Sequence, residues 1–311
     1  IVYSDATKGW VPLEDDVTAL EPVAPPTQKA IFGFGNTGSN VSITNLVNSS
    51  GVVATDTTGV GTAREKLGAA GYGGDKAIFG YGSAGPDLSM TNLVSNSGVV
   101  STDVTGVGTA RRDIRATTYG LDKAIFGYGV TSGVVSITNL VNSSGVVSTD
   151  VTGVGTAREQ LGAAGYGGDK AIFGYGTNGG NVSMTNLVSS SGVVSADVSG
   201  VGTGRYALAA ASYGSDKALF GYGYASSYVS ITNLVSNTGV VSSDVSGVGT
   251  ARFRLAAASY GGDKALFGYG NTGSQVSITN LVSSSGVVAS NVTGVGTARS
   301  NLAAAGFSTS A

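Results

Sequence analysis

The candidate catalytic residues of this chain are carboxylates, because the sequence contains no histidine and no cysteine and most hydrolytic and redox mechanisms therefore lose a participant. The commonest general base, the commonest transition-metal ligand and the thiol nucleophile are therefore missing. Glu65, Asp113 and Glu159 are carboxylates at positions that differ among otherwise similar segments. A pair of them facing a cleft could hydrolyse a glycosidic bond. Nothing else in the sequence supports such a pair, so we expect a protein that is not an enzyme, with no catalytic residues, no cofactor and no assigned metal site.

Binding is indicated instead by aromatic and cationic residues at variable positions. These candidate ligand-binding residues are Tyr206, Tyr224, Tyr228, Phe253, Arg254 and Arg112. Aromatic side chains stack on sugar rings or anchor protein contacts, because they offer a large area at low cost in conformational entropy. The alternative is that they fill space within their own loops.

The elements that would position these residues belong to an internal repeat. The sequence Lys-Ala-(Ile/Leu)-Phe-Gly begins at Lys29, Lys76, Lys123, Lys170, Lys217 and Lys264, a spacing of 47 residues. One further step of 47 residues reaches Ala311, so the array fills 29–311 without insertions. A period of this length is typical of solenoids, propellers or arrays. The repeated positions are expected to form the scaffold, and the variable ones to carry specificity.

Each repeat contains four segments with the character of short β-strands. In one unit they are 217–223, 229–235, 240–245 and 254–261. Alternating polarity, β-branched residues and Gly, Asn and Ser at the boundaries favour strands over helices. Four short strands per unit fit a propeller blade, and the Ala-rich and Gly-rich segment suits the crowded innermost position.

The two ends of the array are complementary. It opens with the strand that starts at Lys29 and ends with the segment 301–307, so the last strand can complete the first blade and remove free sheet edges. A stacked β-solenoid is the alternative, but the sequence has no terminal caps. We predict an all-β, six-bladed β-propeller of four-stranded blades over 29–311. The sequence does not decide whether Ca²⁺ binds in its channel, since backbone carbonyls and Asp would suffice as ligands.

Residues 1–28 differ from the repeats and are predicted to form an extended leader. They contain the only Trp and four of the five prolines, and 21–27 has the composition of an extended linker. Because the chain begins with Ile1, we interpret it as a processed product or as part of a longer polypeptide. The expected role of the leader is to tether the propeller.

The repeat resembles the kelch family. In kelch repeats an Arg begins the innermost strand and a glycine pair ends the second strand. The matching residues are the Arg series at Arg64, Arg111, Arg158, Arg205, Arg252 and Arg299, and Gly-Tyr-Gly sequences such as Gly80-Tyr81-Gly82. An aromatic separates the glycines here, and the outer-strand Trp of the family is missing. The resemblance covers 29–311 and implies a kelch-like propeller.

Residues 2–16, VYSDATKGWVPLEDD, resemble segments of virion proteins of tailed bacteriophages, especially fibre-type proteins. The repeat units themselves are similar to phage structural proteins. This resemblance implies an extracellular protein on the virion surface, in a fibre, tail or head appendage. It also implies contacts of the leader with other virion proteins, and a homo-oligomer such as a trimer.

Variation is concentrated in two windows of each unit, one after the Arg and one after Gly-Tyr-Gly. In an up-and-down blade both windows lie on the same face. A diversified face on a constant scaffold would suit the binding of a host-surface glycan or receptor, although loop drift gives the same pattern. The alternative functions are a purely structural decoration protein that contacts other virion proteins, and a secreted bacterial lectin-like protein.

The charges set further expectations. The net charge is −2 without a basic run, and no stretch of 18 apolar residues occurs, so neither nucleic acid nor membrane insertion is expected. Repeated Lys, Arg and Asp residues are expected to pair within or between blades. Arg115 replaces a small residue of the innermost strand, where it would fill the channel or pair with Asp113.

Overall fold

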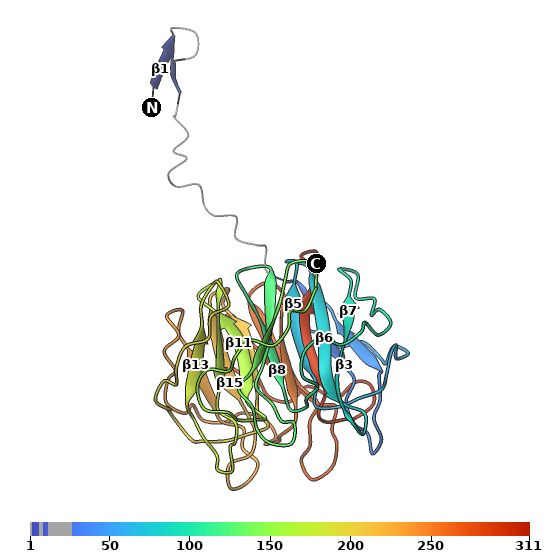
Figure 1. The fold of residues 1–311 in the computed structure, drawn as a ribbon. Coiled ribbons are helices and arrows are strands. Elements are labelled where there is room, and N and C mark those ends of the chain that lie inside the picture. The colour runs from blue at the N-terminus through green and yellow to red at the C-terminus, as the bar shows by residue number, and fades with distance from the viewer. Residues whose placement is uncertain (1, 6–8, 12–26) are drawn as a thin grey trace.

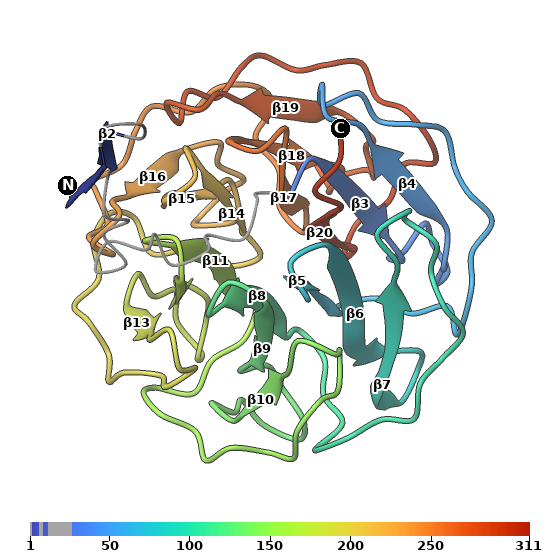
Figure 2. The same ribbon diagram turned by 90° about the horizontal axis from the view of Figure 1, so that it is seen from above.

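The computed structural model describes residues 2–5, 9–11 and 27–311, and every regular element in these ranges is a β-strand. Residues 27–311 form six three-stranded antiparallel sheets arranged around a central axis in a propeller-like ring (Figure 2). From the innermost strand outwards, the sheets are β20 (Ala303–Phe307), β3 (Lys29–Gly33) and β4 (Thr44–Val47); β5 (Gly68–Tyr72), β6 (Lys76–Ser83) and β7 (Asp87–Val94); β8 (Arg115–Tyr119), β9 (Lys123–Gly127) and β10 (Thr138–Val141); β11 (Gly162–Tyr166), β12 (Lys170–Gly174) and β13 (Thr185–Val188); β14 (Ala209–Tyr213), β15 (Lys217–Gly221) and β16 (Thr232–Val235); β17 (Ala256–Tyr260), β18 (Lys264–Gly268) and β19 (Thr279–Val282).

Part of the predicted leader also forms strands. β1 (Val2–Asp5) pairs with β2 (Gly9–Val11) in an antiparallel two-stranded sheet. The predicted linker at 21–27 lies outside the described residues except for Thr27. Within the described ranges, no helix is long and apolar enough to cross a membrane.

Small residues next to large ones allow neighbouring sheets to pack closely. A Cβ added to Gly33, at the end of β3, would lie 2.7 Å from the ring of Phe79 in β6 of the next sheet. At the next interface, a Cβ added to Gly80 would likewise lie 2.7 Å from the ring of Phe126. These side chains are fully buried, so the core consists of the interfaces between sheets.

One of the four predicted strands, the segment 240–245, does not form a continuous strand. Residues 240–245 pair with the sheet through isolated bridges at Val241 and Val245 and through the Ser242 N–H, which donates to the Leu234 carbonyl at 2.8 Å. Between them, the Ser242 hydroxyl accepts the Leu234 N–H at 3.0 Å and Asp244 binds Thr203, so side chains replace part of the backbone ladder. The strand predicted at 217–223 is also shorter, ending at Gly221, because Tyr222 has a left-handed φ of 64°.

The ring is closed by its two ends. β20 pairs with β3 from Ala303↔Gly33 to Phe307↔Lys29, as the sequence predicts. At the same end of the sheets as the C-terminus in Figure 1, backbone hydrogen bonds connect each innermost hairpin to the next one. Thr27 and Gln28 complete this belt by accepting the N–H groups of Gly262 and Gly261 at 3.1 and 3.0 Å. The ring therefore includes these two residues of the predicted leader. We call this end of the molecule the turn face.

The repeated arginines are buried in the interfaces between sheets. Arg158 donates from Nε to the Tyr175 carbonyl at 2.8 Å and from Nη2 to Asn186 Oδ1 at 2.7 Å. Its guanidinium lies 4.4 Å above the ring of Tyr128 in the preceding sheet. Arg158 Nη1 is also 4.0 Å from Asp197. The expectation that repeated charges form structural pairs is confirmed.

The aspartates of this network fix the segments that connect successive sheets. The hydroxyl and N–H of Thr62 bind Asp103, which also accepts the Asn92 amide at 2.9 Å. Burial raises the pKa of Asp103, but the hydrogen bonds from Thr62 and Asn92 outweigh it and lower the pKa below its ordinary value of 3.8. The same downward shift occurs at Asp56, Asp150, Asp197 and Asp244.

We expect these carboxylates to make the protein sensitive to acid. A carboxylate with a lowered pKa in the folded state stabilises the fold above its unfolded pKa, and this contribution is lost as pH falls through the folded pKa. The free energy of unfolding should therefore decrease below about pH 4. Asp244→Asn, which copies the natural Asn291 of the last repeat, should reduce this pH dependence. Denaturant unfolding between pH 3 and pH 7 measures how the free energy of unfolding changes with pH in the wild type and in Asp244→Asn. An equal pH dependence in the two proteins would contradict the stabilising role of the Asp244 carboxylate.

Candidate ligand-binding face

Antiparallel bridges bring the two variable windows of each sheet together. Tyr206 and Tyr224 exchange backbone hydrogen bonds of 3.1 and 2.9 Å, and Tyr224 forms a further bridge with Tyr228. Three side chains therefore stand beside one another at the end of the β14-β15-β16 sheet, opposite the turn face. We call this end the variable face. The prediction that both windows share one face is confirmed.

Each of the six sheets presents three residues at these equivalent backbone positions. We call these sets of three the triads, and their side chains differ from sheet to sheet. They are Ser300-Asn36-Asn40, Glu65-Ser83-Asp87, Arg112-Val130-Val134, Glu159-Thr177-Asn181, Tyr206-Tyr224-Tyr228 and Phe253-Asn271-Gln275. One backbone frame thus displays polar, acidic, cationic and aromatic side chains in different sheets.

Four aromatic rings form one continuous cluster on the variable face. The centroid of Tyr224 lies 5.4 Å from Tyr206 and 5.6 Å from Tyr228, and Tyr228 stacks on Phe253 at 5.0 Å. The Arg254 guanidinium lies 4.7 Å from the Phe253 centroid. All five side chains are half-buried. Within residues 27–311, the tyrosine hydroxyls of this aromatic cluster make no hydrogen bond, so they remain free to bind a ligand.

Arg112 lies apart from the aromatic cluster. It precedes β8, and the β11-β12-β13 sheet separates it from Tyr206. Its Nη1 contacts both carboxylate oxygens of Asp87, at 2.9 and 3.0 Å. The structure thus brings together five of the six residues predicted to bind ligand and places Arg112 in an ion pair on another part of the face.

A closed ring of backbone hydrogen bonds surrounds the axis at the variable face. Each member donates its N–H to the carbonyl of the equivalent residue in the preceding sheet, at 2.8–3.2 Å. The members of this axial ring are Lys66, Asp113, Gln160, Ala207, Arg254 and Asn301, and all have left-handed φ angles between 51° and 58°. We did not predict this ring from the sequence. The sequence contains one indication of it: none of these six variable positions holds a β-branched residue, and β-branched residues disfavour a left-handed φ.

The carboxylates considered for catalysis have partners in the protein or are poorly solvated. Asp113 lies 3.7 Å from Lys66 Nζ, yet burial raises its pKa more than the nearby cations lower it. Burial and the charge of Asp113 also raise the pKa of Glu159. Glu65 accepts the Asn301 amide at 2.7 Å. Arg115, which was predicted to fill the channel or pair with Asp113, donates to the Ile114 carbonyl at 2.9 Å, and the ion pair of Asp113 is with Lys66.

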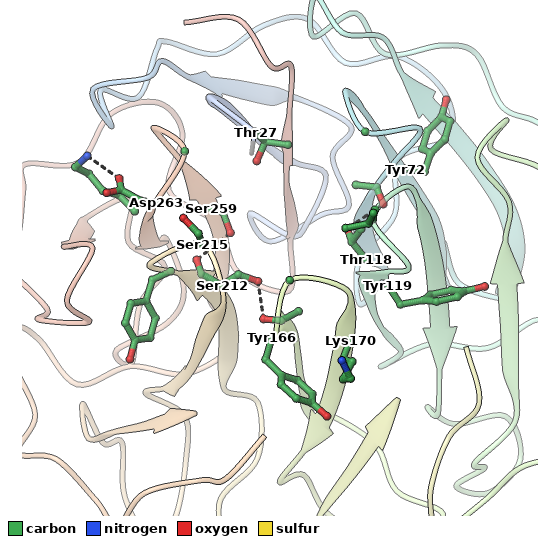
Figure 3. Close-up of a pocket in the computed structure, with 18 residues that line it drawn as sticks. Thr27, Tyr72, Thr118, Tyr119, Tyr166, Lys170, Ser212, Ser215, Ser259 and Asp263 are labelled. Carbon is green, nitrogen blue, oxygen red and sulfur yellow. Dashed lines mark hydrogen bonds and ion pairs between the residues drawn. The ribbon is translucent and has the colours of Figure 1, made fainter. Parts of the chain in front are cut away.

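The turn face contains a cavity of about 300 Å³ around the axis (Figure 3). Hydroxyls of the innermost strands surround it, but they bind carbonyls of neighbouring sheets. Ser212 donates to Gly165 at 2.8 Å, and Thr118 donates to Gly71 at 3.0 Å. In the described part of the chain, no group of three or more His, Cys, Asp or Glu residues could hold a metal ion.

The variable face thus combines a constant backbone frame with diversified triads, an aromatic cluster and one adjoining cation. Neither a scan against protein-family models nor a search of curated proteins found a match to this chain.

Proposed function

We propose that the protein is a non-enzymatic appendage of a phage virion, in a fibre, the tail or the head surface. In this proposal a kelch-like, six-bladed propeller binds a glycan or receptor of the host surface through its variable face. The observation that carries it is the set of triads, because a constant backbone with different side chains at one end is the arrangement of a recognition surface. The resemblance of residues 2–16 to virion proteins supports the phage assignment.

A glycan is the ligand that best suits the aromatic cluster. Sugar rings present C–H groups that stack on aromatic faces, and their hydroxyls can bind the free tyrosine hydroxyls. The cluster is supported by backbone bridges and by contacts among its own rings, so little ordering is required on binding. This arrangement favours a shallow surface site rather than a deep pocket.

The triple variant Tyr206→Ser, Tyr224→Asn, Tyr228→Asn tests the proposal. Its new side chains are those of Ser300, Asn36 and Asn40, which occupy the same backbone frame in another sheet, so the fold should be retained. We expect the wild-type chain to bind glycans on an array and the triple variant to lose that binding. Ser215→Ala on the turn face is the control. Equal binding by all three proteins, or none by the wild type, would contradict the proposal.

A structural decoration protein is the second candidate, and one observation favours it. The first valine after each outer turn is strongly exposed, between 61% and 66%. These residues are Val52, Val99, Val146, Val193, Val240 and Val287. An apolar girdle of this kind suits contacts with other proteins. A particle in which the girdle and the variable face are both covered would favour this candidate over host binding.

A further inference from the structure

We infer that the ligand of the variable face is an acidic glycan, whose sugar rings stack on the aromatic cluster while a sugar carboxylate binds Arg254. This inference rests on the proposed glycan-binding function and adds the chemical class of the ligand. Two observations support it: the position of Arg254 beside the aromatic cluster, and the lack of a hydrogen-bond or ion-pair partner for its guanidinium in residues 27–311.

The backbone of Arg254 is held firmly beside the cluster. Its N–H donates to the Ala207 carbonyl at 2.8 Å, and its carbonyl accepts the Asn301 N–H at 2.9 Å. The residue is thereby fixed in the axial ring with a φ of 56°. The side chain is in turn held against Phe253, 4.7 Å from the ring centroid. A guanidinium supported in this way loses little freedom when it binds a ligand.

Arg254 also differs from the other cations of the variable face in having no acceptor. Lys66 and Arg112 pair with Asp113 and Asp87, at 3.7 and 2.9 Å. Within residues 27–311, the Arg254 guanidinium has no carboxylate within 4.0 Å and makes no hydrogen bond. Its two neighbours in the axial ring are Ala207 and Asn301, so neither brings a carboxylate to it.

The chemistry of this arrangement favours a carboxylate over a neutral sugar. A planar guanidinium binds a carboxylate through two parallel, charge-assisted hydrogen bonds, which are roughly twice as strong as neutral ones. A face of Arg254 lies toward Phe253, but its edge N–H groups stay available in the plane of the guanidinium. A uronic acid or a sialic acid could place its carboxylate there and its ring on the tyrosines.

The test measures binding of the full chain to oligosaccharides that contain uronic or sialic acid and to the same oligosaccharides with their carboxyl groups reduced. Sulfated sugars are measured as well, to distinguish a carboxylate ligand from a sulfate ligand. We expect the wild type to prefer the carboxylate forms. Arg254→Gln should weaken their binding by roughly tenfold or more and remove the preference, and Arg254→Lys should fall between the two. Gln160 and Lys66 occupy equivalent positions in the axial ring, so both variants should fold. Lys217→Gln, which removes a charge paired with Asp216 on the turn face, should bind as the wild type does.

The outcomes separate this inference from the proposed function. Equal binding of acidic and reduced sugars, lost in the Tyr206→Ser, Tyr224→Asn, Tyr228→Asn variant, would overturn the acidic ligand and leave glycan binding intact. A preference that survives in Arg254→Gln, or binding of sulfated sugars only, would also overturn it. If the wild type binds no sugar, both the inference and the proposed function fail.

Discussion

Arg158→Leu is expected to lower the free energy of unfolding by about 3–5 kcal/mol, because each buried hydrogen-bonding group left without a partner costs about 1–3 kcal/mol. The substitution leaves the Tyr175 carbonyl and Asn186 Oδ1 without their donor in a fully buried interface. It also removes the cation from the face of the Tyr128 ring. Leucine cannot replace any of these contacts. Urea denaturation followed by circular dichroism measures the loss.

The same substitution at Arg252 provides a matched comparison. Its Nε donates to the Tyr269 carbonyl at 2.8 Å, but its Nη2 and Asn280 Oδ1 are buried without partners. The cost of that unsatisfied pair is already present in the wild type, so Arg252→Leu should destabilise by about 1–3 kcal/mol less than Arg158→Leu. A loss at Arg252 equal to or larger than that at Arg158 would contradict the role assigned to the arginine–asparagine hydrogen bond.

Deletion of residues 299–311 is expected to abolish cooperative folding. The deletion removes β20 and with it the innermost strand beside β3. It also removes Arg299, which bonds to the Phe34 carbonyl at 2.9 Å and to Asn45 at 2.7 Å. The buried apolar cluster around Ile31 and Phe79 would then face solvent. Gel filtration and thermal unfolding should show an expanded or aggregated chain without a sharp transition.

The shorter deletion of residues 309–311 is the control for closure. These three residues are exposed at the end of the chain. Their loss should change the stability by no more than about 0.5 kcal/mol, as is usual for surface changes. A chain without 299–311 that unfolds cooperatively at the wild-type temperature would show that the pairing of the two ends does not hold the ring together.

The sequence allowed the repeat, the strand character of three segments per unit and the closure by β20 to be predicted, because all three follow from periodic apolar patterns. The strand expected at 240–245 was not predicted correctly. Its polarity is that of a strand, but Ser242 and Asp244 use their side chains to bind Leu234 and Thr203. Alternating polarity does not distinguish an outward-facing serine from one that bonds to the neighbouring backbone.

The parts of the candidate site that follow from the order of strands within one sheet could be predicted from the sequence. The parts that depend on contacts between side chains or between sheets could not. The aromatic cluster follows from the positions of Tyr206, Tyr224 and Tyr228 at neighbouring turns of one sheet. Arg112 was assigned to the same site from its variability and charge, which do not indicate that Asp87 neutralises it. The axial ring arises only when backbones of all the sheets meet at the axis, so no single repeat encodes it.

We propose that the variable face is the surface that binds ligand. Hydrogen–deuterium exchange of the chain with and without a glycan that it retains on an array locates that surface directly. We expect slower exchange at 203–208, 222–230 and 251–255, with no change at the turns 213–217 and 260–264 of the opposite face. Slower exchange confined to those turns or to the cavity beside them would contradict it.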